Sequence, residues 1–313
     1  MTPPLYLVTG GAGFIGSHLT DALLAAGHRV RVLDDLSTGK RANLDPAVEL
    51  VVGDVSDPAA VRAAFDGVAG CFHLAAIASV QRCNEDWLGT HRVNLGGTIA
   101  VLDAARAAGR VPVVYASSAA VYGALSGVAS EESPTVPLSA YGADKLGSEQ
   151  HARAGFVVHG IPSVGLRFFN VFGPRQDPAS PYSGVISLFA AALVGRRGLT
   201  VHGDGLQTRD FIYVADIVAF LMASMRLAAE RPGCTVLNAC TGGQTSIRGL
   251  AHDLAELLQV QPDIATSAPR AGDVRHSQGS TALAETMLGL RAKTPLLAGL
   301  ERTLASISSP ERV

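Results

Sequence analysis

The segment Leu5-Tyr-Leu-Val-Thr-Gly10-Gly-Ala-Gly13-Phe-Ile-Gly16 begins with an apolar run of strand length that ends in glycines. An amphipathic stretch follows from Phe14 to Ala26, with leucines at helical spacing. Gly10 would allow a tight turn, Gly13 a close approach of backbone to a pyrophosphate, and Gly16 close packing of helix against strand. Phosphates would then lie at the helix N-terminus, where free N–H groups point outward. The segment therefore predicts a strand, a phosphate-binding turn and a helix.

A second predicted strand, over 29–33, ends at Asp34 and Asp35, eighteen residues after Gly16. A carboxylate at this position can accept hydrogen bonds from the ribose hydroxyls of adenosine, and it would repel a 2′-phosphate. The arginines of this strand precede the acidic pair, whereas a phosphate clamp would follow it. The sequence therefore favours NAD over NADP as the cofactor.

Strands and helices alternate through the first half of the chain, which is the pattern of a parallel sheet. The 313 residues exceed what one compact core usually holds, so we expect two lobes. A Pro-rich stretch over 173–184 indicates where the chain leaves the sheet for the second lobe. The expected fold class is α/β, a Rossmann doubly wound parallel sheet with a smaller C-terminal α/β substrate lobe. Strands are expected over 5–9, 29–33, 48–52, 70–74, 111–117 and 162–168, with an edge strand over 235–239, and helices over 14–26, 91–108 and 140–158.

Tyr141 and Lys145 lie four residues apart in Tyr141-Gly-Ala-Asp-Lys145, and Ser118 lies twenty-three residues before Tyr141. On a helix, side chains at this spacing share one face, roughly 6 Å apart. A free tyrosine has a pKa of about 10 and is mostly protonated at neutral pH. A neighbouring ammonium favours the phenolate, and a serine at a strand end can relay the proton. We therefore expect Ser118, Tyr141 and Lys145 to be catalytic residues that remove a proton from a substrate hydroxyl.

The composition excludes several classes of protein. The net charge is −2 and no basic run occurs, so nothing indicates nucleic-acid binding. No apolar run reaches the length of a membrane span, and the N-terminus lacks the charged and apolar regions of a signal peptide. The four cysteines, Cys71, Cys83, Cys234 and Cys240, have no metal-type spacing, so no metal site is expected. We expect a cytoplasmic protein.

These motifs, together with others along the chain, resemble those of the extended short-chain dehydrogenase/reductases and, within them, the UDP-hexose 4-epimerases. The resemblance covers nearly the whole chain and is highly specific for the family. The matching motifs are Thr9-Gly-Gly-Ala-Gly-Phe-Ile-Gly16, Asp34-Asp-Leu-Ser-Thr-Gly39, His73-Leu-Ala-Ala76, Asn94-Leu-Gly-Gly-Thr98, Ser117-Ser-Ala119, Tyr141-x-x-x-Lys145, Arg167-Phe-Phe-Asn-Val-Phe-Gly173, Gly203-Asp-Gly205, Arg209-Asp-Phe-Ile-Tyr-Val214 and Pro269-Arg-Ala-Gly-Asp273.

The resemblance implies NAD as a cofactor that stays bound through the reaction. The glycine-rich turn would bind the pyrophosphate, Asp34 the adenosine ribose, and Asp54 with Val55 the adenine. Lys145 would bond the nicotinamide ribose as well as tune Tyr141. The implied cofactor contacts are Gly10, Gly13, Phe14, Ile15, Gly16, Asp34, Asp35, Ser37, Gly39, Asp54, Val55, Leu74, Ala75, Ala76, Asn94, Tyr141, Lys145 and Phe168.

The resemblance also implies a UDP-sugar substrate. Arg209 and Arg270 suit the diphosphate, because a guanidinium fork matches phosphate oxygens. Tyr141 would take the proton of the sugar 4′-hydroxyl, directly or through Ser118, to give a 4-keto sugar that turns before it is reduced on its other face. The implied substrate contacts are Ser79, Ser118, Asn170, Thr200, Val201, His202, Arg209, Arg270, Asp273 and Ser277.

Other functions are open on the same fold. A 4,6-dehydratase would carry an acidic pair after Ser118, where this chain has Ala119 and Ala120. A UDP-glucuronate epimerase or decarboxylase would need a partner for the sugar carboxylate, and Arg82 or Arg175 could provide it. A non-catalytic NAD-sensing module is a further alternative, although such modules typically lose one of the three catalytic residues.

The choice of hexose depends on the resemblance at Ser277. A bulky tyrosine at this position restricts the pocket to glucose and galactose, whereas a small residue admits N-acetylhexosamines, so we expect UDP-N-acetylglucosamine and UDP-N-acetylgalactosamine to be accepted as well as UDP-glucose and UDP-galactose. The resemblance further implies a homodimer joined through the helices near 91–108 and 140–158. The expected domains are an NAD-binding domain over 1–169, with a later contribution from about 211–240, and a UDP-sugar-binding lobe over 170–210 and 241–313.

Overall fold

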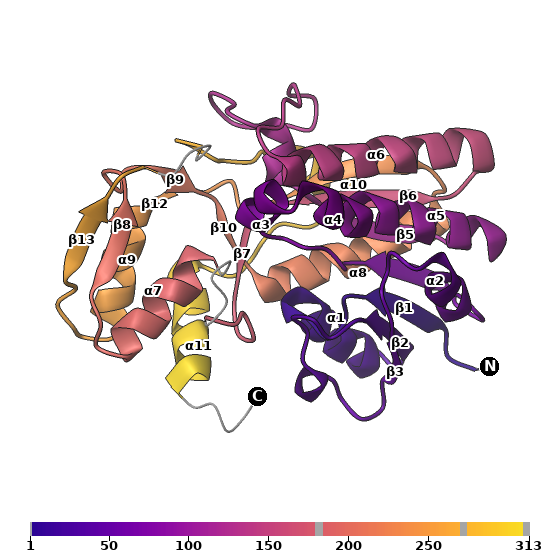
Figure 1. Cartoon of the computed structure of the whole chain (residues 1–313), viewed down its shortest axis with the longest axis horizontal. Coiled ribbons are helices and arrows are strands. Elements are labelled where there is room, and N and C mark those ends of the chain that lie inside the picture. Colours follow the sequence, from indigo (N-terminus) through magenta and orange to yellow (C-terminus); the bar gives the residue numbers. More distant parts are fainter. Residues whose placement is uncertain (1, 179–183, 270–273, 309–313) are drawn as a thin grey trace.

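The computed structural model describes residues 2–178, 184–269 and 274–308, and its central element is a seven-stranded sheet (Figure 1). The strand order is β11-β6-β5-β4-β1-β2-β3, and every pairing is parallel. The order reverses between β1 and β4, and in such sheets ligands bind outside the carboxyl ends of the strands at this switch point. The strands are β1 (Leu5–Thr9), β2 (Arg29–Asp34), β3 (Glu49–Val52), β4 (Gly70–His73), β5 (Val113–Ser118), β6 (Ser163–Phe168) and β11 (Cys234–Ala239).

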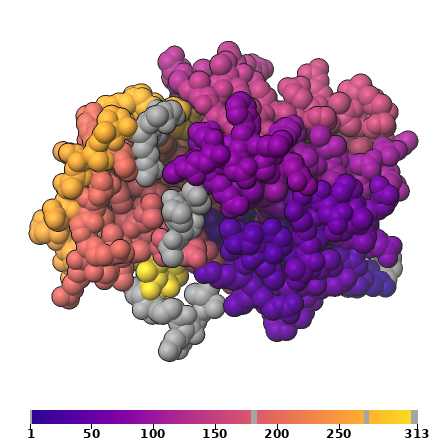
Figure 2. Space-filling view, in the orientation of Figure 1, coloured from indigo at the N-terminus to yellow at the C-terminus, as the bar shows by residue number. Residues whose placement is uncertain are grey.

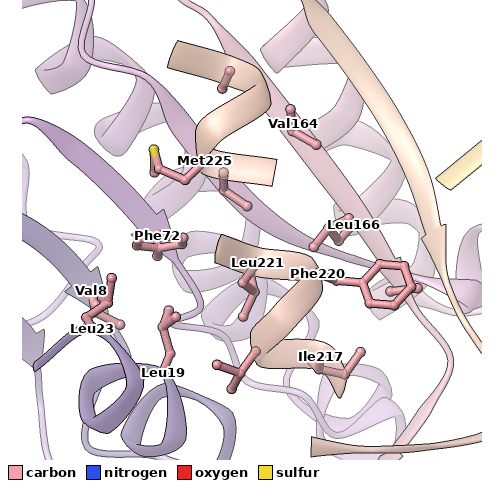
Figure 3. Packing of buried hydrophobic residues seen from close by; sticks show 14 of the residues in the cluster. Val8, Leu19, Leu23, Phe72, Val164, Leu166, Ile217, Phe220, Leu221 and Met225 are labelled. Atoms are coloured by element: carbon pink, nitrogen blue, oxygen red, sulfur yellow. The ribbon is translucent and has the colours of Figure 1, made fainter. Parts of the chain in front are cut away.

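Helices cover both faces of this sheet. On one face, α1 (Phe14–Ala25), α8 (Val214–Glu230) and α10 (Ala282–Leu288) close a core in which the strand side chains meet leucines and isoleucines of the helices (Figure 3). On the other face, α2 (Pro58–Ala64), α5 (Gly97–Ala107) and α6 (Ala140–His159) close a second core. Both faces are therefore buried, which explains why the strands read as nearly continuous apolar runs.

A second group of elements has its own core. It holds α7 (Val185–Val194), α9 (Ile247–Leu257) and α11 (Leu296–Ser308). Figures 1 and 2 show this group at one end of the long axis and the seven-stranded sheet at the other. Phe14 and Ile15 at the start of α1 also pack against the core of the second group, so the glycine-rich turn lies between the two. Three two-stranded sheets complete the second group of elements. They pair β8 (Leu199–His202) with β13 (Ile264–Ser267), β7 (Asn170–Phe172) with β10 (Phe211–Tyr213), and β9 (Thr208–Arg209) with β12 (Thr245–Ser246).

The helix predicted over 91–108 is present but is not uniform. It begins with α4 (Trp87–His91), passes through the π-helical turn η2 (Arg92–Gly96) and continues as α5. Such π turns occur frequently at functional sites. Three further short helices lie in the connections between the strands of the sheet. They are η1 (Arg41–Asn43), α3 (Val80–Glu85) and the 3-10 turn η3 (Ala119–Tyr122).

The seven predicted strands and the parallel sheet are confirmed, including the edge strand β11. The sequence did not predict α10, which lies in the range assigned to the substrate lobe but packs on α8 and β11, with Ala284 buried in the core beside the sheet. The apolar face of α10 therefore fits the sheet layer, and the domain bounds stay a prediction. Among the described residues, no helix has the length and apolar character of a membrane span, and no cluster of three or more potential metal ligands occurs.

Candidate active site

The turn between β1 and α1 requires glycine at two positions for internal reasons. Gly10 has a φ of 69°, a left-handed conformation that L side chains rarely adopt. A Cβ on Gly16 would lie 2.2 Å from the Gly10 carbonyl oxygen. The Gly10 N–H donates to the Leu33 carbonyl at 2.9 Å, which ties the turn to β2. These two glycines are therefore explained by the packing of the protein itself.

Gly13 is not explained in this way. It precedes α1 with φ −78° and ψ −174°, a backbone conformation that any residue adopts. The nearest atom to a Cβ at Gly13 would be the Gly10 carbonyl oxygen, at 3.3 Å. The first N–H groups of a helix have no partner within the helix, and no side chain caps α1. An open backbone beside a helix N-terminus fits a bound pyrophosphate, so this turn fits a dinucleotide.

Asp34, the predicted ribose contact, lies at the end of β2 and is 7% exposed. Its Oδ2 accepts from the Ala12 N–H and its Oδ1 from the Leu36 N–H, both at 2.9 Å. Burial raises the pKa of Asp34, and these two N–H groups act in the opposite direction. The carboxylate therefore lies directly against the glycine-rich turn, where a ribose next to the pyrophosphate would be.

The other predicted contacts on this side are less direct. Asp35 is exposed and accepts from the N–H and hydroxyl of Ser37, at 2.9 and 2.7 Å, so it shapes the loop. A Cβ on Gly39 would lie 2.8 Å from the Asp34 carboxylate, so glycine lets the loop close on it. Asp54 accepts from the backbone of its own turn at 2.8 Å, and the Val55 side chain is buried in the core. Their contact with adenine stays a prediction.

The segment Leu74-Ala75-Ala76 follows β4 at the switch point, and two buried residues hold it. The Thr9 hydroxyl accepts from the Ala75 N–H at 3.3 Å and lies 2.8 Å from Nδ1 of His73. Burial lowers the pKa of His73 to about 3, so its ring is neutral. Sequence reasoning gave Thr9 and His73 no role, although both stand in the motifs that carried the resemblance.

Asn94 fixes the backbone just beyond this segment. Its Oδ1 accepts from the Ile77 N–H at 2.8 Å, and its Nδ2 donates to the Ile77 carbonyl at 3.2 Å. It lies in the π turn η2 and is buried. The amide therefore supports the chain beside the switch point through two opposed hydrogen bonds.

Ser118, Tyr141 and Lys145 come together at the carboxyl end of β5. The helix α6 begins after Ser139, whose hydroxyl accepts from the Gly142 N–H at 3.1 Å. This cap sets Tyr141 in the first turn of α6, and Lys145 follows on the same face, with its Nζ 5.7 Å from the centre of the Tyr141 ring. The Lys145 ammonium donates to the Ala116 carbonyl at 2.8 Å.

The pKa values of this group differ from the expectation. Burial raises the pKa of Tyr141 to about 12, while the Ser118 hydroxyl acts in the opposite direction. Burial also lowers the pKa of Lys145 to about 8. Desolvation is the largest cause of both shifts, and Tyr141 holds its proton at rest.

A cavity of about 290 Å³ opens beside Tyr141. Ser118, Asn170, Arg209 and Ser277 line it as well, so predicted residues from five separate segments meet in one place. Most of the other lining residues are small or apolar. They are Val80, Ala119, Ala120, Tyr122, Gly123, Leu125, Gly127, Ala129, Leu138, Ser139, Phe168, Phe169, Val274, His276 and Gln278.

Several predicted substrate residues do not line this cavity. Ser79 is buried and caps α3 by accepting from the Arg82 N–H at 3.0 Å, and its contact with a substrate stays a prediction. Thr200, Val201 and His202 form β8, which pairs through one edge with β13. Arg270 and Asp273 lie outside the described residues.

A buried ion pair that sequence reasoning did not identify holds the end of β5. Arg167 donates from Nε and Nη2 to the two carboxylate oxygens of Glu149, at 2.9 and 2.7 Å. The Ser117 hydroxyl donates to the same carboxylate at 2.5 Å. The strand end that carries Ser118 is therefore fixed from behind. Arg167 lies in one of the motifs that carried the resemblance, and this was the signal in the sequence that it has a role. Its partner Glu149 lies 18 residues away, in another element, so the pair could not be predicted.

Comparisons with known proteins agree with this geometry. The model of the NAD dependent epimerase/dehydratase family matches residues 6–240. The UDP-glucose 4-epimerase of Mycolicibacterium smegmatis is 37% identical over 307 residues, covering 95% of this chain and 96% of that protein. A Thermotoga maritima UDP-glucose 4-epimerase solved with UDP-glucose has a TM-score of 0.93 and 32% identity, covering 98% of this chain and 99% of its own.

A second solved structure extends the comparison to an N-acetylated sugar. The UDP-N-acetylglucosamine 4-epimerase of Methanobrevibacter ruminantium, in complex with UDP-N-acetylmuramic acid, has a TM-score of 0.93 and 31% identity. The alignment covers 99% of this chain and 100% of that one. With the parallel sheet, the glycine-rich turn, and the serine and tyrosine that line one cavity beside the lysine, the chain belongs to the NAD-dependent epimerase/dehydratase family and, within it, to the UDP-hexose 4-epimerases of the extended short-chain dehydrogenase/reductases.

Proposed function

We propose that this protein interconverts UDP-hexoses at C4, and that it accepts UDP-N-acetylglucosamine and UDP-N-acetylgalactosamine as well as UDP-glucose and UDP-galactose. One observation carries the proposal: Ser118, Tyr141 and Ser277 line a single cavity next to Lys145. A proton-abstracting group and the residue expected to limit the size of the sugar therefore share one binding space.

The chain's own residues supply the proton chemistry. Tyr141 takes the proton of the sugar 4′-hydroxyl, directly or through the Ser118 hydroxyl, and returns it at the end of the cycle. The Lys145 ammonium, 5.7 Å from the tyrosine ring, stabilises the phenolate that forms. Bound NAD supplies the two-electron acceptor, and then the donor, for C4. The Arg167–Glu149 pair keeps the strand end with Ser118 in position.

Epimerisation requires that the hexose present both of its faces to the same groups, so the cavity must let the sugar turn. Ala119, Ala120, Gly123 and Gly127 line one part of it and carry little or no side chain. The uridine diphosphate would meanwhile stay anchored by Arg209, whose guanidinium suits phosphate oxygens. Small lining residues thus support both the rotation and the acceptance of an N-acetyl group.

The same lining argues against a dehydratase. Elimination of water needs an acid and a base beside the sugar, in addition to the tyrosine. No aspartate or glutamate occurs among the described residues that line the cavity, and Ala119 and Ala120 follow Ser118 directly. A neutral sugar that is only oxidised and reduced fits this lining better.

A substrate with a sugar carboxylate also fits poorly. Neither of the two arginines that could pair with a uronate is among the described residues that line the cavity. Arg82 is exposed, and Arg175 forms an ion pair with Asp21 at 2.8 Å. Among the described residues that line the cavity, Arg209 is the one permanently charged side chain, and its expected partner is the diphosphate of the substrate. These observations favour neutral hexoses over UDP-uronic acids.

The direct test is incubation of the purified protein with UDP-N-acetylglucosamine and, separately, with UDP-glucose, without added cofactor, with the C4 epimers resolved by proton NMR. We expect both pairs to interconvert, because the retained cofactor is regenerated in every cycle. Tyr141→Phe serves as the inactive control, with turnover lowered by roughly 10²–10⁴-fold. Turnover of neither pair would contradict the proposal and favour the NAD-sensing alternative.

Ser277 tests the hexose specificity. Ser277→Tyr fills the cavity from one side, so we expect it to abolish turnover of the N-acetylated pair while UDP-glucose and UDP-galactose still interconvert. Ser277→Ala is the matched control and should retain both activities, because it adds no volume. Equal loss of both activities in Ser277→Tyr, or unchanged turnover of the N-acetylated pair, would refute the role of this position.

We also propose a cytoplasmic homodimer joined through α5 and α6. The outer surfaces of these helices expose Ile99, Val157 and Val158, at 40%, 74% and 69%. Exposed aliphatic side chains on these two neighbouring helices favour burial against a second copy. Light scattering on the purified protein would give the mass directly, and a monomer would contradict this.

A further inference from the structure

Asp210 is a carboxylate in the short link between β9 and β10, directly after Arg209, and sequence reasoning gave it no role. It is fully buried, and burial raises its pKa while its hydrogen bonds act in the opposite direction. Its Oδ1 accepts from the N–H and the hydroxyl of Thr241, at 2.9 and 2.6 Å. Its Oδ2 accepts from the N–H groups of Gly242 and Gly279, at 2.9 and 3.3 Å. One side chain therefore joins two segments that are distant from each other in the sequence.

The second of these segments forms one wall of the cavity, and we call residues 274–280 the wall segment. Four of its residues line the cavity, namely Val274, His276, Ser277 and Gln278. Gly279 follows them directly, so its N–H fixes the wall segment to Asp210 one residue beyond the last lining side chain. Asp210 itself does not line the cavity. Its carboxylate can therefore influence a bound sugar only through the wall segment.

Two further hydrogen bonds hold the wall segment beside the same carboxylate. The Ser277 N–H donates to the Thr208 carbonyl at 3.1 Å, two residues before Asp210. The Gln278 side chain donates from Nε2 to the Gly242 carbonyl at 2.7 Å, and the Gly242 N–H in turn donates to Asp210. Ser277 and Gln278 are therefore held in a frame of hydrogen bonds that is centred on the Asp210 carboxylate.

We propose that Asp210 is a positioning residue that holds Ser277 and Gln278 in place across the cavity from the catalytic groups, and that it thereby sets the affinity for the sugar. The proposal rests on the proposed function, because that function gives Ser277 the role of limiting the size of the sugar. Ser118 and Tyr141 lie on β5 and α6, and none of the four hydrogen bonds to the Asp210 carboxylate reaches these elements. Loss of the carboxylate should therefore displace the wall segment and leave the proton chemistry in place.

Amide hydrogen exchange followed by NMR tests the positioning without any substrate. In Asp210→Ala the Gly279 N–H loses its charged acceptor, so we expect the amide protons of the wall segment to exchange roughly tenfold faster or more. Asp216→Ala is the matched control, because Asp216 is also a buried carboxylate and accepts from the N–H groups of Lys293 and Thr294, at 3.0 and 3.1 Å. The control should speed exchange at these two residues and leave the wall segment unchanged.

Steady-state kinetics give the second readout. Asp210→Ala should raise the KM of UDP-glucose and of UDP-N-acetylglucosamine about tenfold, whereas kcat should change far less, because the groups that move the proton keep their own supports. The Kd of NAD should stay the same, since the glycine-rich turn and Asp34 lie on the other half of the site. Asp216→Ala should leave kcat and KM at their wild-type values.

Wild-type exchange rates of the wall segment in Asp210→Ala would overturn the proposal. A fall in kcat at unchanged KM, or an equal rise of KM in Asp216→Ala, would do the same. If Asp210→Ala does not fold, Asp210→Asn replaces it: its amide keeps one oxygen as an acceptor, so the same changes are expected on a smaller scale, and wild-type values in both readouts would refute the role. A wild-type protein without epimerase activity would refute the proposed function alone, because the exchange rates still decide whether Asp210 holds the wall segment.

Discussion

The cofactor half and the substrate half of the site are built differently. On the cofactor half, hydrogen bonds with backbone groups at the strand ends hold the key residues: Gly10 bonds to β2, Asp34 to the turn after β1 and to Leu36, and Lys145 to β5. On the substrate half, the cavity is lined by segments between residues 80 and 278. One of its walls is closed by hydrogen bonds from Ala129 to the Gln278 carbonyl and from Ser280 to the Ala129 carbonyl, both 2.8 Å.

This difference has a physical consequence. The cofactor half depends on the order of strands in the sheet, which places consecutive strand ends side by side, so few of its residues can change without disturbing the fold. The substrate half depends on long-range packing of short elements, and its lining side chains can change with little effect on the sheet. We therefore expect that different substitutions change the stability, the cofactor affinity and the substrate affinity independently of one another.

The largest effect is expected in the glycine-rich turn, where two glycines should behave differently. Gly13→Ala adds a methyl group 3.3 Å from the Gly10 carbonyl oxygen, a tight contact that requires a small shift, and it occupies the space of a pyrophosphate, so NAD affinity should fall roughly a hundredfold with a smaller loss of stability than at Gly16. Gly16→Ala meets the Gly10 backbone at 2.2 Å, so the free energy of unfolding should fall by about 1–3 kcal/mol even without NAD. Calorimetric NAD titration and urea unfolding measure the two quantities. Equal loss of stability in both variants would remove the argument that Gly13 serves a ligand.

A smaller effect is expected on the substrate half at Arg209. Its Nη1 donates to the Thr208 carbonyl at 2.7 Å, and its side chain lines the cavity. Arg209→Ala removes a charge-assisted contact to the diphosphate, so the Kd of UDP should rise about tenfold while NAD affinity stays the same. Arg226→Ala, at an exposed position on α8, is the matched control. A parallel fall in NAD affinity would mean that the two halves are not separable.

The smallest effect is expected at the surface, where Lys40 pairs with Asp177 at 2.8 Å. This ion pair links the loop beside Asp34 to the segment that follows β7, but its side chains are 59% and 40% exposed. Lys40→Ala should change the free energy of unfolding by no more than about 0.5 kcal/mol, because solvent screens exposed pairs. A change of several kcal/mol in urea unfolding would show that this link holds the two halves together.

Much of the cofactor half could be predicted from the sequence because its signals are local. The glycine spacing, the acidic residue after the second strand and the tyrosine–lysine pair each lie within one turn or one helix. The strands were predictable because both faces of the sheet are buried. Contacts between distant segments were not predictable: the packing of α10 against β11 was not foreseen, and Glu149 was not recognised as the partner of Arg167.

The sequence by itself determined the family, the parallel sheet and the residues that we propose for the proton chemistry, because residue type and short spacing encode them. The tertiary structure alone decided which residues share the cavity and how their charges respond to burial. Burial raises the pKa of Tyr141 to about 12 and lowers the pKa of Lys145 to about 8. These properties follow from desolvation, which depends on every segment packed around a group rather than on its neighbours in the chain.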